Sequence, residues 1–197
     1  MITLGIDPGT LFTGFGLVEK SGKSYRAIDY GVISTHAKDE MPKRLKQIYD
    51  ALAGKIEQYR PTKVSLETVF FGKNVQSALK LGQVRGVVMI LAMNYGLPIS
   101  EYAPREVKKA ITGNGNAAKE QVEFMIKNFL ALQGTKARAD AFDALAIALS
   151  DSLFSTSSQH LTSPHTATKV KTWQQFISTN PSRIVNTTNN PANKNTL

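Results

Sequence analysis

Four acidic residues stand out in the sequence because each one interrupts an apolar stretch. Asp7 closes the short apolar segment Ile2–Asp7, and Glu67 lies inside a later apolar segment rich in valine. Asp140 and Asp143 are three residues apart at the start of an Ala- and Leu-rich segment, so they share one helix face. If the segments of Asp7 and Glu67 are neighbouring strands, ~5 Å apart, both acids stand at the carboxyl edge of one sheet, where open α/β sheets place their sites.

Such a group of acids suits metal chemistry. Four carboxylates in one pocket repel one another strongly unless cations neutralise them. Oxygen ligands from short acidic side chains favour Mg²⁺ or Mn²⁺, which retain several waters. Two such ions about 3.5–4 Å apart can activate an attacking water and stabilise a leaving oxygen at a phosphodiester. Bound cations also reverse the local charge, which lets a basic protein use an acidic site on an anionic substrate.

Each acid also has a purely structural interpretation. Asp7 precedes a Pro-Gly pair and is a typical first residue of a turn. Asp140 and Asp143 would complement the dipole at a helix N-terminus, and Glu67 is compatible with a solvent-facing edge strand. The joint occurrence of two strand-end acids and a helix pair favours one common site.

Hydrophobic periodicity predicts the elements that carry these acids. Three strands come first and helices then alternate with strands, which indicates an α/β sandwich around a five-stranded mixed sheet whose first three strands are antiparallel. The predicted strands are 2–7, 12–18, 25–34, 64–70 and 98–102. The predicted helices are 41–59, 75–95, 104–111, 117–132 with Asn116 as N-cap, and 138–154. Small residues in helix 75–95 would let it pack closely against either a second copy of the chain or the sheet.

The composition changes near residue 154, which predicts a domain boundary. Residues 1–154 are expected to form one domain with a hydrophobic core. Residues 155–197 contain 24 Ser, Thr, Asn or Pro residues, four basic residues and no acidic residue, so we expect a flexible tail. The 197-residue chain has no cysteine, which excludes a disulfide framework, a thiolate zinc site and a cysteine nucleophile.

The chain carries a formal net charge of +9, with +5 in residues 1–154 and +4 in residues 155–197. This excess suits a polyanion such as nucleic acid, although a soluble basic protein without such a partner has the same charge. The longest apolar stretch is far shorter than a membrane span. The N-terminus lacks the basic start of a signal peptide, so we expect a cytoplasmic protein.

Taken together, these segments resemble the RuvC family of Holliday-junction resolvases, a branch of the ribonuclease-H-like nucleases. The matching motifs are LGIDPGT at 4–10, TGFG at 13–16, LETVF at 66–70, KN at 73–74, SALKLGQ at 77–83 and ADAFDALAIA at 139–148. They run in the family's order and cover about residues 1–153. The resemblance implies a ribonuclease-H-like three-layer sandwich and a Mg²⁺-dependent endonuclease with two ions per subunit, for which Mn²⁺ can substitute. It implies that the metal-binding catalytic residues are Asp7, Glu67, Asp140 and Asp143.

The resemblance also implies the substrate and the partners. A homodimer would nick two opposing strands of a four-way junction symmetrically, in homologous recombination and DNA repair, and leave 5′-phosphate and 3′-hydroxyl ends. Phe70 matches an aromatic residue that stacks at the opened junction, where stacking contributes ~1–3 kcal/mol; a position in the core is the alternative. Lys108 and Lys119 match lysines that contact phosphates. A branch-migration helicase complex as partner rests on the resemblance only.

Two other functions fit part of the pattern. Actin-like ATPases share a Gly-Ile-Asp-x-Gly-Thr loop and the sheet topology, but that fold needs two such domains and residues 1–154 supply one. A non-catalytic nucleic-acid-binding module of the same fold would have no physical reason to bury four mutually repelling acids. ATP binding would favour the first alternative, and both predict no Mg²⁺-dependent cleavage.

Overall fold

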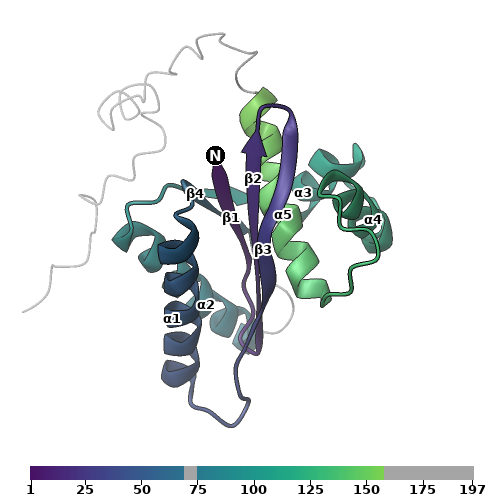
Figure 1. Ribbon diagram of the computed structural model, residues 1–197. Coiled ribbons are helices and arrows are strands. Elements are labelled where there is room, and N and C mark those ends of the chain that lie inside the picture. Colours follow the sequence, from purple (N-terminus) through teal and green to yellow (C-terminus); the bar gives the residue numbers. More distant parts are fainter. Residues whose placement is uncertain (69–74, 158–197) are drawn as a thin grey trace, which may run out of the picture. The chain divides into compact units, whose positions relative to one another are not determined.

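The computed structural model describes residues 1–68 and 75–157, which are built around a five-stranded sheet (Figure 1). The strands are β1 (Ile2–Asp7), β2 (Phe12–Ser21), β3 (Ser24–Ser34), β4 (Lys63–Glu67) and β5 (Ile99–Tyr102). They lie in the order β3-β2-β1-β4-β5. β1, β2 and β3 pair antiparallel, whereas β4 pairs parallel with both β1 and β5. The predicted mixed sheet is therefore confirmed, and its first and fourth strands are neighbours, which is the condition under which Asp7 and Glu67 are expected to lie together.

The helices form a layer on each face of the sheet. The described helices are α1 (Met41–Tyr59), α2 (Val75–Asn94), α3 (Pro104–Thr112), α4 (Lys119–Phe129) and α5 (Ala139–Ser157). One hydrophobic core joins α1 and α2 to the first face of the sheet. A second core joins α5 to α3 and α4 on the opposite face (Figure 1). This arrangement confirms the predicted α/β three-layer sandwich.

Alternation along β1 assigns its side chains to the two layers. Leu4 and Ile6 are fully buried in the core with α1 and α2. Successive side chains of a strand point to opposite faces, so Thr3, Gly5 and Asp7 face α5. The aliphatic residues of β1 thus pack in the core with α1 and α2. Its other face carries Gly5, which allows close contact with α5, and Asp7.

A tight turn joins β2 to β3, and a second turn precedes α4. Gly22 and Lys23 form the two-residue turn between β2 and β3, and Gly22 has a φ of 59°, which glycine adopts without strain. The predicted helix 117–132 is wrong at both ends, since α4 spans only Lys119–Phe129. Asn116 is not its N-cap, because Ala118 occupies that position. Asn116 lies in the preceding turn, where its N–H donates to the side-chain oxygen of Asn114 (3.0 Å).

Two other predictions extend beyond the described residues. The predicted strand 64–70 appears as Lys63–Glu67, and residues 69 and 70 lie outside the described part of the chain. The predicted tail lies outside it as well, apart from the last turn of α5. Within the described ranges, every helix is too short or too polar to cross a membrane.

Candidate active site

The register of the sheet brings the two strand acids together. β1 and β4 pair in parallel from Thr3 opposite Lys63 to Ile6 opposite Leu66. The next residues in this register are Asp7 and Glu67. Both strands end here, so the two acids lie side by side at the carboxyl edge of the sheet, on the face that α5 covers.

A row of glycines lets α5 approach this face at backbone distance. A Cβ atom on Gly14 would lie 2.0 Å from the carbonyl oxygen of Asp140, and a Cβ atom on Gly5 would lie 2.2 Å from that of Ala144. Gly14 is also the partner of Asp7 in the β1–β2 register. The absent side chains therefore bring the first turns of α5, with Asp140 and Asp143, directly against the strand that carries Asp7.

Electrostatic interactions show that these acids share one environment. Burial raises the pKa of Asp7 from 3.8 to about 7, and neighbouring carboxylates add to this effect. Those carboxylates are, in decreasing order of effect, Asp143, Glu67 and Asp140. Burial, followed by the charge of Asp143, also raises the pKa of Glu67. The other three sequence-predicted acids thus lie within electrostatic reach of Asp7.

The two helix acids are paired with cations. Lys119 Nζ lies 2.7 Å from Asp143 Oδ2, and this hydrogen bond raises the pKa of the lysine. Arg138 Nε lies 3.4 Å from Asp140 Oδ2. Its guanidinium also stacks on Phe12, with 3.8 Å between Cζ and the ring centroid. Burial therefore raises the pKa of both strand acids, whereas the helix acids have basic partners.

A pocket of about 210 Å³ joins the acids to the predicted DNA-binding lysines. Glu67, Asp143, Lys108 and Lys119 all line it. Lys108 Nζ donates to the Ala117 carbonyl (2.9 Å), which holds this side chain along the pocket wall. Both lysines therefore lie beside the acids, whereas Phe70 lies outside the described residues.

The loop that follows Asp7 is held by a residue that sequence analysis did not identify. Arg44 of α1 is 8% exposed, and its Nε donates to the Thr10 carbonyl (3.1 Å). The same Nε also contacts the Thr35 hydroxyl at 3.1 Å, and that hydroxyl donates to the Thr10 carbonyl (2.6 Å). The Thr13 hydroxyl donates to the Gly9 carbonyl (2.6 Å). A buried arginine from across the sheet therefore fixes the turn between Asp7 and β2.

The donor set fits a hard divalent cation. The acids offer oxygen ligands only, and their mutual repulsion is the condition that a bound cation relieves. As the described side chains stand, no three acidic or histidine residues are close enough together to hold one ion. Asp143 and Asp140 are instead paired with Lys119 and Arg138.

A mixed sheet of this order, with acids at the ends of β1 and β4 and on α5, defines the class of ribonuclease-H-like nucleases. The family model for the crossover junction endodeoxyribonuclease RuvC matches residues 3–151. The chain therefore belongs to the RuvC family of crossover junction endodeoxyribonucleases. It is a nuclease of this family, and membership implies dependence on a divalent metal ion.

Individual relatives agree with this assignment. The RuvC of Chloroherpeton thalassium is 49% identical over 185 residues, which is 94% of this chain and 100% of that protein. The RuvC of Porphyromonas gingivalis is 42% identical, over 93% of this chain and 96% of that protein. Among solved structures, T. thermophilus RuvC in complex with a Holliday junction substrate superposes with a TM-score of 0.77 at 32% identity, over 80% of this chain and 96% of the other. The yeast mitochondrial resolvase Ydc2, at 14% identity and a TM-score of 0.60, shares the fold.

Proposed function

We propose that this protein is a Mg²⁺-dependent endonuclease that resolves four-way DNA junctions by paired symmetric nicks. The observation that supports this most directly is the pKa of Asp7, which burial raises to about 7 and to which the charges of Asp143, Glu67 and Asp140 contribute. The related T. thermophilus RuvC has been solved with a Holliday junction. The expected products are 5′-phosphate and 3′-hydroxyl ends.

In this proposal, Asp7, Glu67, Asp140 and Asp143 hold two Mg²⁺ ions. Ions bound there would supply an activated water and would stabilise the leaving 3′ oxygen. Asp7 and Glu67 stand on rigid strand ends, so they define the fixed side of the site. Asp140 and Asp143 reach the same place from α5, and to serve as ligands they must exchange the basic side chains that now pair with them.

Two lysines are the proposed phosphate contacts. Lys108 and Lys119 line the pocket beside Glu67 and Asp143, where a backbone phosphate of the cut strand would lie. Lys119 balances the charge of Asp143 before DNA binds, and an incoming phosphate offers it an alternative partner. Phe70 remains the proposed stacking residue at the junction, on the grounds of its sequence position directly after the Glu67 strand.

We also propose that the protein acts as a homodimer through α2. Several large apolar side chains of this helix are exposed, namely Val75 (69%), Leu79 (65%), Ile90 (58%) and Met93 (67%). Gly82 and Gly86 lie between them along the same helix, and a Cβ atom on either would meet nothing within 4 Å. The sheet contacts of α2 use Val84, Val88 and Leu91 instead. An exposed apolar stripe interrupted by glycines suits close packing against a second copy of itself.

Leu79→Asp is expected to convert the dimer to a monomer, because it places a charge in the centre of this stripe. Sedimentation velocity would measure the change. Phe124→Asp is the matched control, since Phe124 on α4 is also 65% exposed but lies away from α2. A dimer that persists in Leu79→Asp, or that dissociates equally in both variants, would contradict the assignment of the interface.

The proposed catalytic function is tested by cleavage of synthetic four-way junctions. The wild type is expected to nick two opposing strands in Mg²⁺ or Mn²⁺, with linear duplex as the substrate control. Asp7→Asn is expected to abolish nicking and to retain junction binding, since it removes one ligand and leaves Lys108 and Lys119 in place. A wild type that binds junctions and never cuts them with either ion would support the non-catalytic alternative.

A further inference from the structure

α5 contains a second polar group, remote from the proposed metal site. Ser150, Asp151 and Ser152 interrupt its apolar face, and each of the three is fully buried at 0% exposure. We refer to them as the SDS triplet. Asp151 lies 8 residues after Asp143 and 11 after Asp140, which is ~12 and ~16 Å along the helix axis. Burial of a carboxylate is unfavourable unless charged or hydrogen-bonding partners compensate for it. The contacts of Asp151 therefore indicate the role of the triplet.

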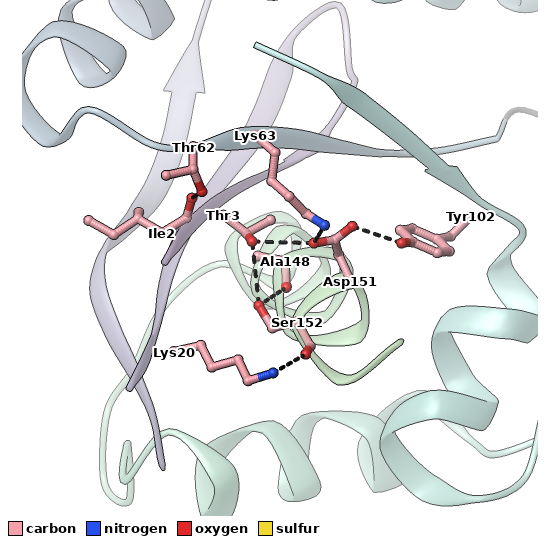
Figure 2. Close-up of polar contacts among 9 residues, drawn as sticks. All are labelled: Ile2, Thr3, Lys20, Thr62, Lys63, Tyr102, Ala148, Asp151 and Ser152. Carbon is pink, nitrogen blue, oxygen red and sulfur yellow. Dashed lines mark hydrogen bonds and ion pairs between the residues drawn. The ribbon is translucent and has the colours of Figure 1, made fainter. Parts of the chain in front are cut away.

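The Asp151 carboxylate connects α5 to three adjacent strands, as Figure 2 shows. Its Oδ2 lies 2.6 Å from Lys63 Nζ on β4 and accepts a hydrogen bond from the Thr3 hydroxyl on β1 (3.3 Å). Its Oδ1 accepts a hydrogen bond from the Tyr102 hydroxyl on β5 (2.7 Å). Burial and the adjacent Asp151 raise the pKa of Tyr102, so this hydroxyl remains a donor at working pH.

The two serines extend the same set of contacts. The Ser152 hydroxyl lies 3.4 Å from the Thr3 hydroxyl, and the Ser152 carbonyl accepts from Lys20 Nζ of β2 (3.4 Å) (Figure 2). The Ser150 hydroxyl lies 3.3 Å from the carbonyl oxygen of Val107 in α3. α3 also carries Lys108, which lines the candidate active site. The triplet thus joins α5 to β1, β2, β4, β5 and α3.

The rest of the buried surface of α5 is apolar, so the triplet supplies the directional contacts of this face. It consists of Ala, Leu, Ile and Phe side chains packed on the glycine row of β1 and β2. Apolar contacts stabilise in proportion to buried area and are not directional. Close packing on the glycine row also resists a shift of the helix, but an ion pair and its hydrogen bonds are satisfied over a narrower range of positions than apolar contacts are. Buried polar contacts are best known for fixing a register in this way.

We infer that the SDS triplet fixes the axial register of α5 on the sheet and so places Asp140 and Asp143 beside Asp7 and Glu67. Asp151 is then a positioning residue for the metal site, since it contacts none of the proposed ligands. The inference rests on the proposed nuclease function, because the register of α5 affects activity only if Asp140 and Asp143 are metal ligands. Functional ligands must be held within about 0.5 Å, and a rigid helix transmits a shift at Asp151 to both acids.

Two variants test the register. Asp151→Asn is nearly isosteric, retains an acceptor for Tyr102 and removes the charge that pairs with Lys63. The double variant Lys63→Met/Asp151→Leu replaces both members of the ion pair by apolar side chains. Leu52→Ala is the control, because Leu52 is fully buried in α1 on the opposite face of the sheet and its truncation destabilises without touching α5.

The first measurement is made without metal. The chain has no cysteine, so spin labels at Lys46→Cys on α1 and Ala139→Cys on α5 report the position of α5 by double electron–electron resonance. Both positions are exposed. We expect a shifted or broadened distance distribution in the two triplet variants and the wild-type distribution in Leu52→Ala.

The second measurement is Mn²⁺ affinity by electron paramagnetic resonance. We expect at least a tenfold loss in Asp151→Asn and in the double variant, with metal-free junction binding within twofold of wild type. Wild-type distances and Mn²⁺ affinity within twofold in both variants would overturn the inference. If the double variant does not fold, Asp151→Asn alone decides the question. A wild type that binds no Mn²⁺ and cuts no junction would refute the proposed function. The spin-label distances are measured without metal, so they test the register of α5 independently of that function.

Discussion

Asp7→Asn is expected to stabilise the metal-free protein even though it abolishes cleavage. The folded protein raises the pKa of Asp7 to about 7, from 3.8 in the unfolded chain, through burial and then the charges of neighbouring acids. A group with a raised folded-state pKa contributes full stability below its unfolded pKa and loses it as the pH rises through the folded pKa. The wild type therefore becomes less stable between pH 4 and pH 7, and asparagine, which carries no charge, avoids this loss.

The magnitude follows from the two pKa values. At pH 8 the charged Asp7 lowers the free energy of unfolding by on the order of 4 kcal/mol relative to a neutral side chain, since each pH unit between the two values corresponds to about 1.4 kcal/mol. At pH 5 the folded protein still holds the proton, and the same difference is only about 2 kcal/mol. The advantage of Asp7→Asn is thus expected to grow by roughly 2–3 kcal/mol between pH 5 and pH 8.

Urea unfolding followed by far-ultraviolet circular dichroism, in EDTA at both pH values, measures this change. The comparison between the two pH values removes any packing difference between Asp and Asn, because packing does not titrate. Asp50→Asn is the control: Asp50 lies on the exposed face of α1, where its side chain is 56% exposed. Its difference from wild type should be small at both pH values. Equal stability differences for Asp7→Asn at pH 5 and pH 8 would refute the account of a buried, mutually repelling acid.

Three further outcomes are expected. The Mn²⁺ affinity of the wild type should fall about tenfold from pH 8 to pH 6, because Asp7 must lose its proton to bind metal; a flat titration by electron paramagnetic resonance would exclude Asp7 as a ligand. Lys119→Ala should weaken junction binding for all arm sequences and reduce the slope of log binding constant against log salt concentration by about one unit. An unchanged slope would exclude Lys119 as a phosphate contact and leave its ion pair with Asp143 as its role. Gly14→Ala should cost roughly 1–3 kcal/mol in urea unfolding because its Cβ would overlap the Asp140 carbonyl, whereas Gly54→Ala, which meets open space, should not destabilise.

The sequence predicted the sheet and the four acids because both leave local patterns. The alternation of Leu4 and Ile6 with Thr3 and Gly5 is visible without coordinates, as is an acid that ends an apolar strand. From the sequence, the pairing of the first and fourth strands is only a condition, and the structure meets it with a parallel register that aligns the two strand ends. Helix ends were less accurate, since α4 begins at Lys119 with Ala118 as its N-cap, and Asn116 belongs to a turn in which its N–H donates to Asn114.

The residues that hold the site in shape were not predictable in this way. Arg44 belongs to an amphipathic helix, where an arginine is usually solvated, and only the packing of α1 brings it under the Thr10 carbonyl. Arg138 has no sequence relation to Phe12, which lies more than a hundred residues away. Asp151 resembles any helix acid until three strands are placed around it. Such contacts depend on tertiary structure, and one sequence carries no local signal for them.

The four acids divide into two pairs by the way their charge is balanced. Asp7 and Glu67 lie on strand ends whose positions the sheet fixes, and burial raises the pKa of both. Asp140 and Asp143 lie on a helix and are paired with Arg138 and Lys119. Without metal, the strand pair can lower its repulsion by holding a proton, while the helix pair does so with basic side chains. A divalent cation bound at the proposed site would replace both, so its binding would release a proton from the strand acids and basic side chains from the helix acids. Those side chains would then lie beside the proposed entry of an anionic DNA backbone, so metal binding and substrate binding would be coupled in one site.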